Sequence, residues 1–165
     1  MLSKKMETAL NKQINQELFS AYQYMGIAAY FAEKNLDGFA HWMRMQAQEE
    51  LAHSGKLFDY VVDRNGKIDL QAIKAPAKTW KDALAALQAA YKAETTNTKQ
   101  INAIMDQAIK ENDHATRVIL QWFVEEQVEE ESSALDLVEK VKLAHGSASA
   151  MFILDRELGT RQLAE

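Results

Sequence analysis

The stretches QEELAH (residues 48–53) and EEQVEE (residues 125–130) decide how this chain folds. Each places two side chains that can bind a metal three residues apart, Glu50 with His53 and Gln127 with Glu130. Residues three apart lie side by side on an α-helix. Apolar residues recur at helical spacing on the same face, so both pairs are expected on helices, pointing inward.

The two stretches belong to an internal repeat with an offset of 77 residues. Glu17 precedes Glu50 by 33 residues, and Glu94 precedes Gln127 by 33 residues. Further pairs matched at this offset are Asn35 with Asn112, Ile27 with Ile104 and Asp59 with Asp136. A duplicated helix pair explains the repeat, and it places the polar positions at one level around a pseudo-twofold axis.

The rest of the chain favours long helices. Its 165 residues include 25 alanines but only 6 glycines and 1 proline, so many short strands are excluded. The few helix-breaking sites leave long segments at roughly 4–34, 38–64, 81–111 and 114–143, followed by a short one at about 147–158. We predict an all-α fold in a single domain over 1–165: a four-helix bundle, a long crossover of about 16 residues between the second and third helices, and a short fifth C-terminal helix.

Each long segment carries an apolar stripe in alternating steps of four and three residues, which predicts its inward face. In the third segment the expected stripe is Leu84, Leu87, Tyr91, Glu94, Thr98, Ile101 and Met105.

Polar residues interrupt every stripe at mid-length. They form what we call the central cluster: Glu17, Glu50, His53, Glu94, Gln127 and Glu130. One such residue alone would be read as a surface side chain, but six at one level in a repeat indicate a site. The four carboxylates carry a charge of −4, which two divalent cations would cancel, whereas unpaired buried carboxylates would cost several kcal/mol each. Oxygen ligands with one imidazole suit iron, manganese or zinc.

Composition excludes several other classes. The chain has no cysteine, so disulfides, thiolate metal sites and cysteine nucleophiles are ruled out. A net charge of −5 disfavours a nucleic-acid partner. No apolar run is long enough to span a membrane and the N-terminus does not resemble a signal peptide, so we expect a cytoplasmic protein without a membrane partner. Three histidines outside the cluster, His41, His114 and His145, are expected at the surface.

Several motifs resemble those of the bacterial and archaeal non-haem ferritins, over nearly the whole chain. They are NKQINQE (11–17), Tyr24, QEELAH (48–53), LQWFVEEQVEEE (120–131) and LDREL (154–158). The resemblance implies a ferritin-like bundle and an iron-storage ferritin with ferroxidase activity. Such a protein oxidises Fe(II) with O2 or H2O2 at a di-iron centre and stores a ferric mineral inside a hollow homo-oligomeric cage of about 24 chains.

The resemblance also implies roles for individual residues. Glu17, Glu50 and His53 would bind the first iron, with Glu50 bridging to the second. Glu94 and Glu130 would hold the second iron, with Gln127 close to it, Tyr24 beside the centre and Trp122 nearby. A possible third iron would lie at Glu49, Glu126 and Glu129, together with Glu130. Leu51 occupies the position where bacterioferritins carry their haem-binding methionine, so no haem is expected.

Two other classes remain open at this point. One is a di-metal carboxylate oxidase or oxygenase that acts on an organic substrate without storing mineral. The other is a structural or metal-buffering bundle that has no turnover.

Overall fold

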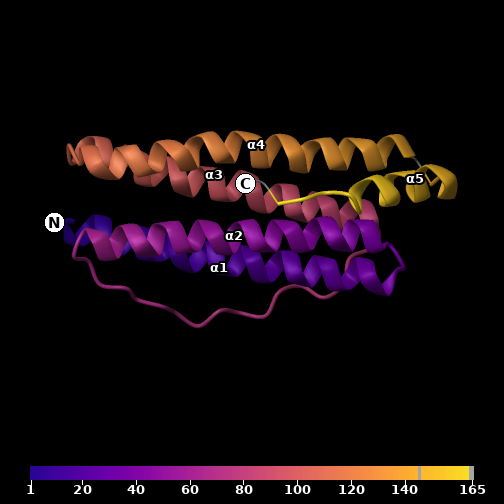
Figure 1. The fold of residues 1–165 in the computed structure, drawn as a ribbon, viewed down its shortest axis with the longest axis horizontal. Helices are drawn as coiled ribbons and strands as arrows, with labels where there is room; N and C mark the ends of the chain where they lie inside the picture. The colour runs from indigo at the N-terminus through magenta and orange to yellow at the C-terminus, as the bar shows by residue number, and fades with distance from the viewer. Residues whose placement is uncertain (145, 164–165) are drawn as a thin grey trace.

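The computed structural model describes residues 1–144 and 146–163. In this part of the chain there are five helices and no strand: α1 (Lys4–Glu33), α2 (Asp37–Asp63), α3 (Ala83–Lys110), α4 (His114–Ala144) and α5 (Ala148–Leu158). Figure 1 shows the four long helices aligned in one bundle, with α5 at one end. The predicted all-α bundle is confirmed, with helix ends within two residues of those expected.

The predicted topology is also observed. The helices of each consecutive pair, α1 with α2 and α3 with α4, pack against each other and run antiparallel. The connection 64–82 then follows the length of the bundle (Figure 1), so that α2 and α3 run in the same direction.

Equivalent turns end the first helix of each pair, as the repeat predicts. Asn35 and Asn112 adopt φ values of 56° and 54°, a left-handed conformation that asparagine tolerates better than most residues. The residue after each asparagine donates its backbone N–H to a carbonyl five residues back, at 3.0 Å from Leu36 and 2.9 Å from Asp113. This bond satisfies a carbonyl that the end of the helix would otherwise leave free.

The fifth helix is fixed to the start of α2. The carboxylate of Asp155 accepts hydrogen bonds from the backbone N–H groups of Gly38 (2.9 Å) and Phe39 (3.0 Å). A Cβ at position 38 would lie 1.6 Å from the Asp155 carbonyl oxygen, so this contact requires glycine. The chain beyond α5 turns back along the bundle (Figure 1).

Two apolar clusters fill the bundle, one on each side of a polar layer. The cluster nearer α5 contains Phe31, Phe39, Met43, Leu87 and Leu137 among others. The cluster at the other end contains Leu10, Ile14, Leu57, Ile101 and Phe123 among others. The central cluster occupies the layer between them.

The predicted stripe was partly wrong for α3. Leu84, Tyr91, Thr98 and Met105 are only half-buried. The buried face is instead Ala86, Leu87, Ala90, Glu94, Asn97, Ile101, Ile104 and Ala108. The prediction followed the larger side chains, but small alanines allow α3 to approach its neighbours on the face where they lie.

The expected surface histidines differ from one another. His114 is exposed as predicted. His41 is half-buried, because the C-terminal segment covers it and places the carbonyl oxygen of Arg161 2.8 Å from its ring. His145 lies outside the described residues. No helix in the described ranges is long and apolar enough to cross a membrane.

Candidate metal centre

All six residues of the central cluster are buried in the polar layer. Each of the four long helices contributes at least one of them, and none is more than 5% exposed. The helical spacing explains this, because positions 50 and 53 share one face of α2 and positions 127 and 130 share one face of α4.

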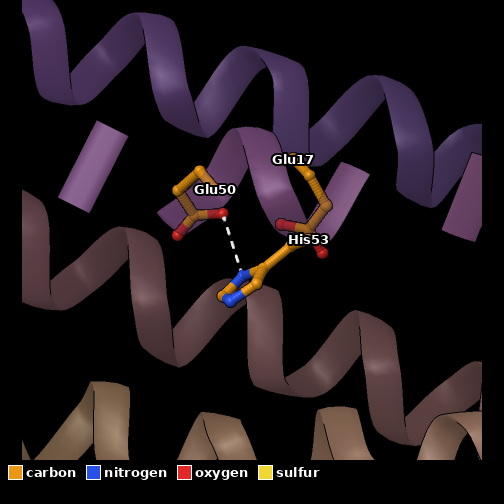
Figure 2. A group of neighbouring side chains, drawn as sticks. All are labelled: Glu17, Glu50 and His53. Atoms are coloured by element: carbon orange, nitrogen blue, oxygen red, sulfur yellow. Dashed lines mark ion pairs between the residues drawn. The ribbon is translucent and has the colours of Figure 1, made fainter. Parts of the chain in front are cut away.

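The first half of the site is a group of three potential ligands. Glu17, Glu50 and His53 each offer an atom within 4.8 Å of the other two. Figure 2 shows the Glu50 carboxylate facing the His53 ring, with the carboxylate of Glu17 beside them. The distance from Glu50 Oε2 to His53 Nδ1 is 3.8 Å.

His53 is neutral at physiological pH. Burial lowers its pKa to about 4, and the nearby charge of Lys56 contributes. Its contact with Glu50 is therefore not an ion pair at pH 7. A neutral imidazole has a free lone pair, which is the form that binds a metal.

Burial has the opposite effect on the carboxylates. It raises the pKa of Glu50 well above the usual range, and Glu17 and Glu94 add to the increase. Burial also raises the pKa of Glu94 to about 7 and that of Glu130 to about 8, with Glu94 and Glu49 adding to the latter and Arg161 opposing it. Without a cation, these groups hold protons that exposed carboxylates would have lost, so the predicted charge of −4 belongs to the metal-bound state.

Glu50 provides the test of whether the site fits a cation. Neither of its side-chain oxygens has a hydrogen-bond partner among the described residues. Glu17, in contrast, accepts from Gln13 at 2.6 Å and from Asn97 at 3.1 Å. An ionised Glu50 without donors would be costly, so in the absence of metal the group keeps its proton beside Glu17. A divalent cation would replace that proton. The group of Glu17, Glu50 and His53 therefore fits a hard cation.

The second half of the site surrounds Glu94. The Tyr24 hydroxyl, 2% exposed, donates a hydrogen bond to Glu94 Oε1. The amide nitrogen of Gln127 donates to Thr98 Oγ1 at 3.0 Å and lies 3.5 Å from Glu94 Oε2. The Gln127 carbonyl oxygen accepts from Asn97 at 3.4 Å. Gln127 thus lies beside Glu94, and its amide links α4 to α3.

The three residues predicted for a third iron, which we call the peripheral carboxylates, are placed differently from one another. Glu126 lies with Glu130 and His53, each offering an atom within 4.8 Å of the others. Glu49 is engaged by Arg161, whose guanidinium donates to it at 2.7 Å. Glu129 is exposed on α4. Trp122 lies beside this group, its ring centroid 5.4 Å from that of His53.

Four supporting residues escaped the sequence prediction. Three are buried amides that donate to the site: Gln13 and Asn97 to Glu17, and Gln46 to Glu130 at 2.6 Å. Helical spacing could have identified them, since each lies three or four residues from a member of the central cluster on the same face. The fourth is Arg161, whose position depends on the path of the chain after α5 and carries no sequence signal.

Comparison with known proteins agrees with this architecture. The family model for the ferritin-like domain matches residues 7–144. A bacterial non-heme ferritin of Bacteroides fragilis is 38% identical over 98% of this chain and 100% of its own length. One of Staphylococcus epidermidis is 35% identical over 100% of this chain and 99% of its own length.

Solved structures of ferritins also resemble this chain. A novel open pore ferritin from the hyperthermophilic archaeon Archaeoglobus fulgidus is 48% identical, with a TM-score of 0.97, and the match covers 98% of this chain and 100% of that one. A closed form of the same ferritin, engineered by site-directed mutagenesis, also has a TM-score of 0.97 and covers 99% of this chain. The bundle, the buried carboxylate–histidine layer and these relatives together show that the chain belongs to the ferritin family, among the non-haem ferritins of prokaryotes.

Proposed function

We propose that this protein is an iron-storage ferritin that binds two Fe²⁺ in the central cluster of each chain, oxidises them and passes the iron to a mineral core. The observation that carries the proposal is the buried Glu50 side chain, which receives no hydrogen bond among the described residues and offers an oxygen within 4.8 Å of ligand atoms of Glu17 and His53. Iron is the substrate: two Fe²⁺ each give one electron to O2, which takes up two protons and becomes H2O2. H2O2 is the alternative oxidant.

Different residues around the central cluster have different proposed roles. Glu17, Glu50 and His53 would hold one iron, and Glu94 and Glu130 the other, with Gln127 beside it and Glu50 bridging. Gln13, Gln46 and Asn97 orient the carboxylates through hydrogen bonds. Tyr24 donates to Glu94 and keeps that carboxylate directed into the layer. The surrounding apolar clusters exclude water, which strengthens the electrostatic attraction between the carboxylates and the cations.

The peripheral carboxylates continue the row of acidic side chains from the central cluster toward the exposed surface of α4. Glu126 is half-buried and Glu129 is exposed. We assign a third iron position to this group, shared with Glu130.

The exposed apolar surface supports assembly into a cage. A groove of about 500 Å³ on α1 and α2 is lined by Leu18, Tyr22, Met25, Leu51 and Ile73, together with four further residues. On α5, Phe152 and Ile153 are 64% and 66% exposed. Exposed apolar patches of this kind mark interfaces, and we infer a closed homo-oligomer of about 24 chains. Light scattering should then give a mass near 450 kDa, about 24 times the chain mass of 18.7 kDa.

The cavity that borders Tyr24 is too small for an organic substrate. The cavity lined by Tyr24, Pro76 and Trp80 has a volume of about 70 Å³. Pockets for organic ligands typically measure roughly 300–1,000 Å³. This space beside Tyr24 admits O2 or water but not an organic substrate of ordinary size.

The test of the proposed function is the Glu50→Ala variant. Stopped-flow oxidation of two Fe²⁺ per chain should lose its fast phase, slowing by at least about tenfold, because the bridging ligand is absent. Asp59→Ala removes an exposed carboxylate from the same helix and is the matched control. The particle mass of both variants should match the wild type. Fast oxidation that is unchanged in Glu50→Ala would refute the assignment of the site.

A further inference from the structure

The C-terminal segment brings a positive charge to the edge of the proposed iron site. Arg161 follows α5 by three residues, and the chain beyond α5 turns back along the bundle (Figure 1). The Arg161 guanidinium donates to Glu49 Oε2 at 2.7 Å. Both side chains are largely buried, at 24% and 14% exposure, so this ion pair is shielded more than most surface pairs.

Two further contacts hold Arg161 in place. Its guanidinium carbon lies 4.4 Å from the centroid of the Trp42 ring, within the range of a cation–π interaction. Its backbone carbonyl oxygen lies 2.8 Å from the His41 ring. The segment is thus anchored at both its backbone and its side chain, yet Arg161 Nη1 is buried and has no hydrogen-bond partner among the described residues. One of its donor groups is therefore left unsatisfied.

The ion pair changes the set of ligands available to a peripheral cation. His53, Glu126 and Glu130 converge. Glu49 is not part of that group, and its carboxylate is bonded to Arg161 instead. A guanidinium and a metal cation compete for the same carboxylate oxygens. Arg161 therefore occupies the place that Glu49 would give to a third iron.

We propose that Arg161 is an internal counter-ion that weakens the peripheral iron position: a third cation must displace it from Glu49, and displacement removes one of the contacts that hold the C-terminal segment on the bundle. Arg161 acts through Glu49 and is thus a positioning residue, not a ligand. The inference rests on the proposed third iron position. Its test measures only the binding of the third equivalent of metal and is therefore separate from the test of the first two.

Metal titration of the intact assembly tests the first half of this proposal. The probe is Zn²⁺, which binds carboxylate and imidazole ligands without oxidation. In Arg161→Gln the third equivalent should bind at least about tenfold more tightly than in the wild type, since a competing charge is gone, while the first two are unchanged. Arg161→Lys keeps the charge and should stay close to the wild type. Arg156→Gln removes an exposed arginine of α5 and is the charge-matched control.

Hydrogen exchange of residues 159–163 tests whether metal binding at the peripheral position loosens the C-terminal segment. Exchange should accelerate when the third equivalent of Zn²⁺ binds, but not with the first two. In Glu49→Gln the metal should no longer have this effect. A third-site affinity that is the same in Arg161→Gln and the wild type, or tail exchange that does not respond to the third equivalent, would overturn the proposal. Failure of the first two equivalents to bind would instead contradict the proposed function.

Discussion

Proton release on metal binding is the most quantitative consequence of the buried carboxylates. Glu94 and Glu130 have pKa values raised to about 7 and about 8. At pH 6.5, which is below both values, the two groups are mostly protonated in the metal-free protein and together hold more than one proton. Two divalent cations must displace these protons, because only ionised carboxylates bind them well. His53, with a pKa of about 4, is already neutral and releases none.

The assay is calorimetric titration of the metal-free protein with Zn²⁺ at pH 6.5, in buffers of different ionisation enthalpy. The slope of the observed enthalpy against the buffer enthalpy gives the protons released. We expect more than one proton per chain for the first two equivalents, since Glu50 adds to those held by Glu94 and Glu130. Glu130→Gln should reduce the release by about one proton, whereas Glu125→Gln, an exposed position on the same helix, should not.

The sign of the pH dependence follows from the direction of these shifts. Because the pKa values of Glu94 and Glu130 are raised in the folded protein, protons compete more strongly with metal as the pH falls from 8 toward 6. Metal affinity should weaken over that interval. A release below about half a proton, with affinity independent of pH, would refute the account of buried, protonated carboxylates.

Three further predictions concern other parts of the chain. Replacing all three peripheral carboxylates, Glu49, Glu126 and Glu129, by alanine should leave rapid oxidation of the first two irons intact. The O2 consumed per iron, measured with an oxygen electrode, should change. An unchanged ratio of O2 to iron would argue against a third iron position. Gln127→Glu raises the site charge from −4 to −5 and should tighten the second metal and slow repeated turnover, and unaltered affinity together with unaltered turnover would leave Gln127 as a packing residue. Asn112→Gly should raise the apparent melting temperature slightly, because glycine adopts the observed φ of 54° without strain. Asn112→Ala should lower it by an amount equivalent to about 1 kcal/mol. Equal melting temperatures of the two variants would show that the turn is not strained.

Much of this architecture could be predicted because each signal is local. The repeat at 77 residues placed Glu17 opposite Glu94 and the Glu50–His53 pair opposite Gln127–Glu130, and helical spacing directed all of them inward. The same repeat paired Asn35 with Asn112, and the structure shows an equivalent left-handed residue at the end of a helix at both positions.

What could not be predicted depends on how distant segments meet. The buried face of α3 follows Ala86, Ala90 and Ala108, whose importance lies in the close approach of neighbouring helices and not in their hydrophobicity. The contact of Arg161 with Glu49 spans 112 residues and depends on the anchoring of α5 by Asp155. No periodic pattern encodes such a contact.

The central claim is that two irons occupy the central cluster of each chain. Its most direct test is anomalous diffraction at the iron edge, on crystals grown without metal and then soaked in Fe²⁺ under anaerobic conditions. The account predicts two strong peaks per chain, one among Glu17, Glu50 and His53 and one among Glu50, Glu94 and Glu130. Iron at the surface or at the peripheral carboxylates, with no peak beside Glu50, would contradict it.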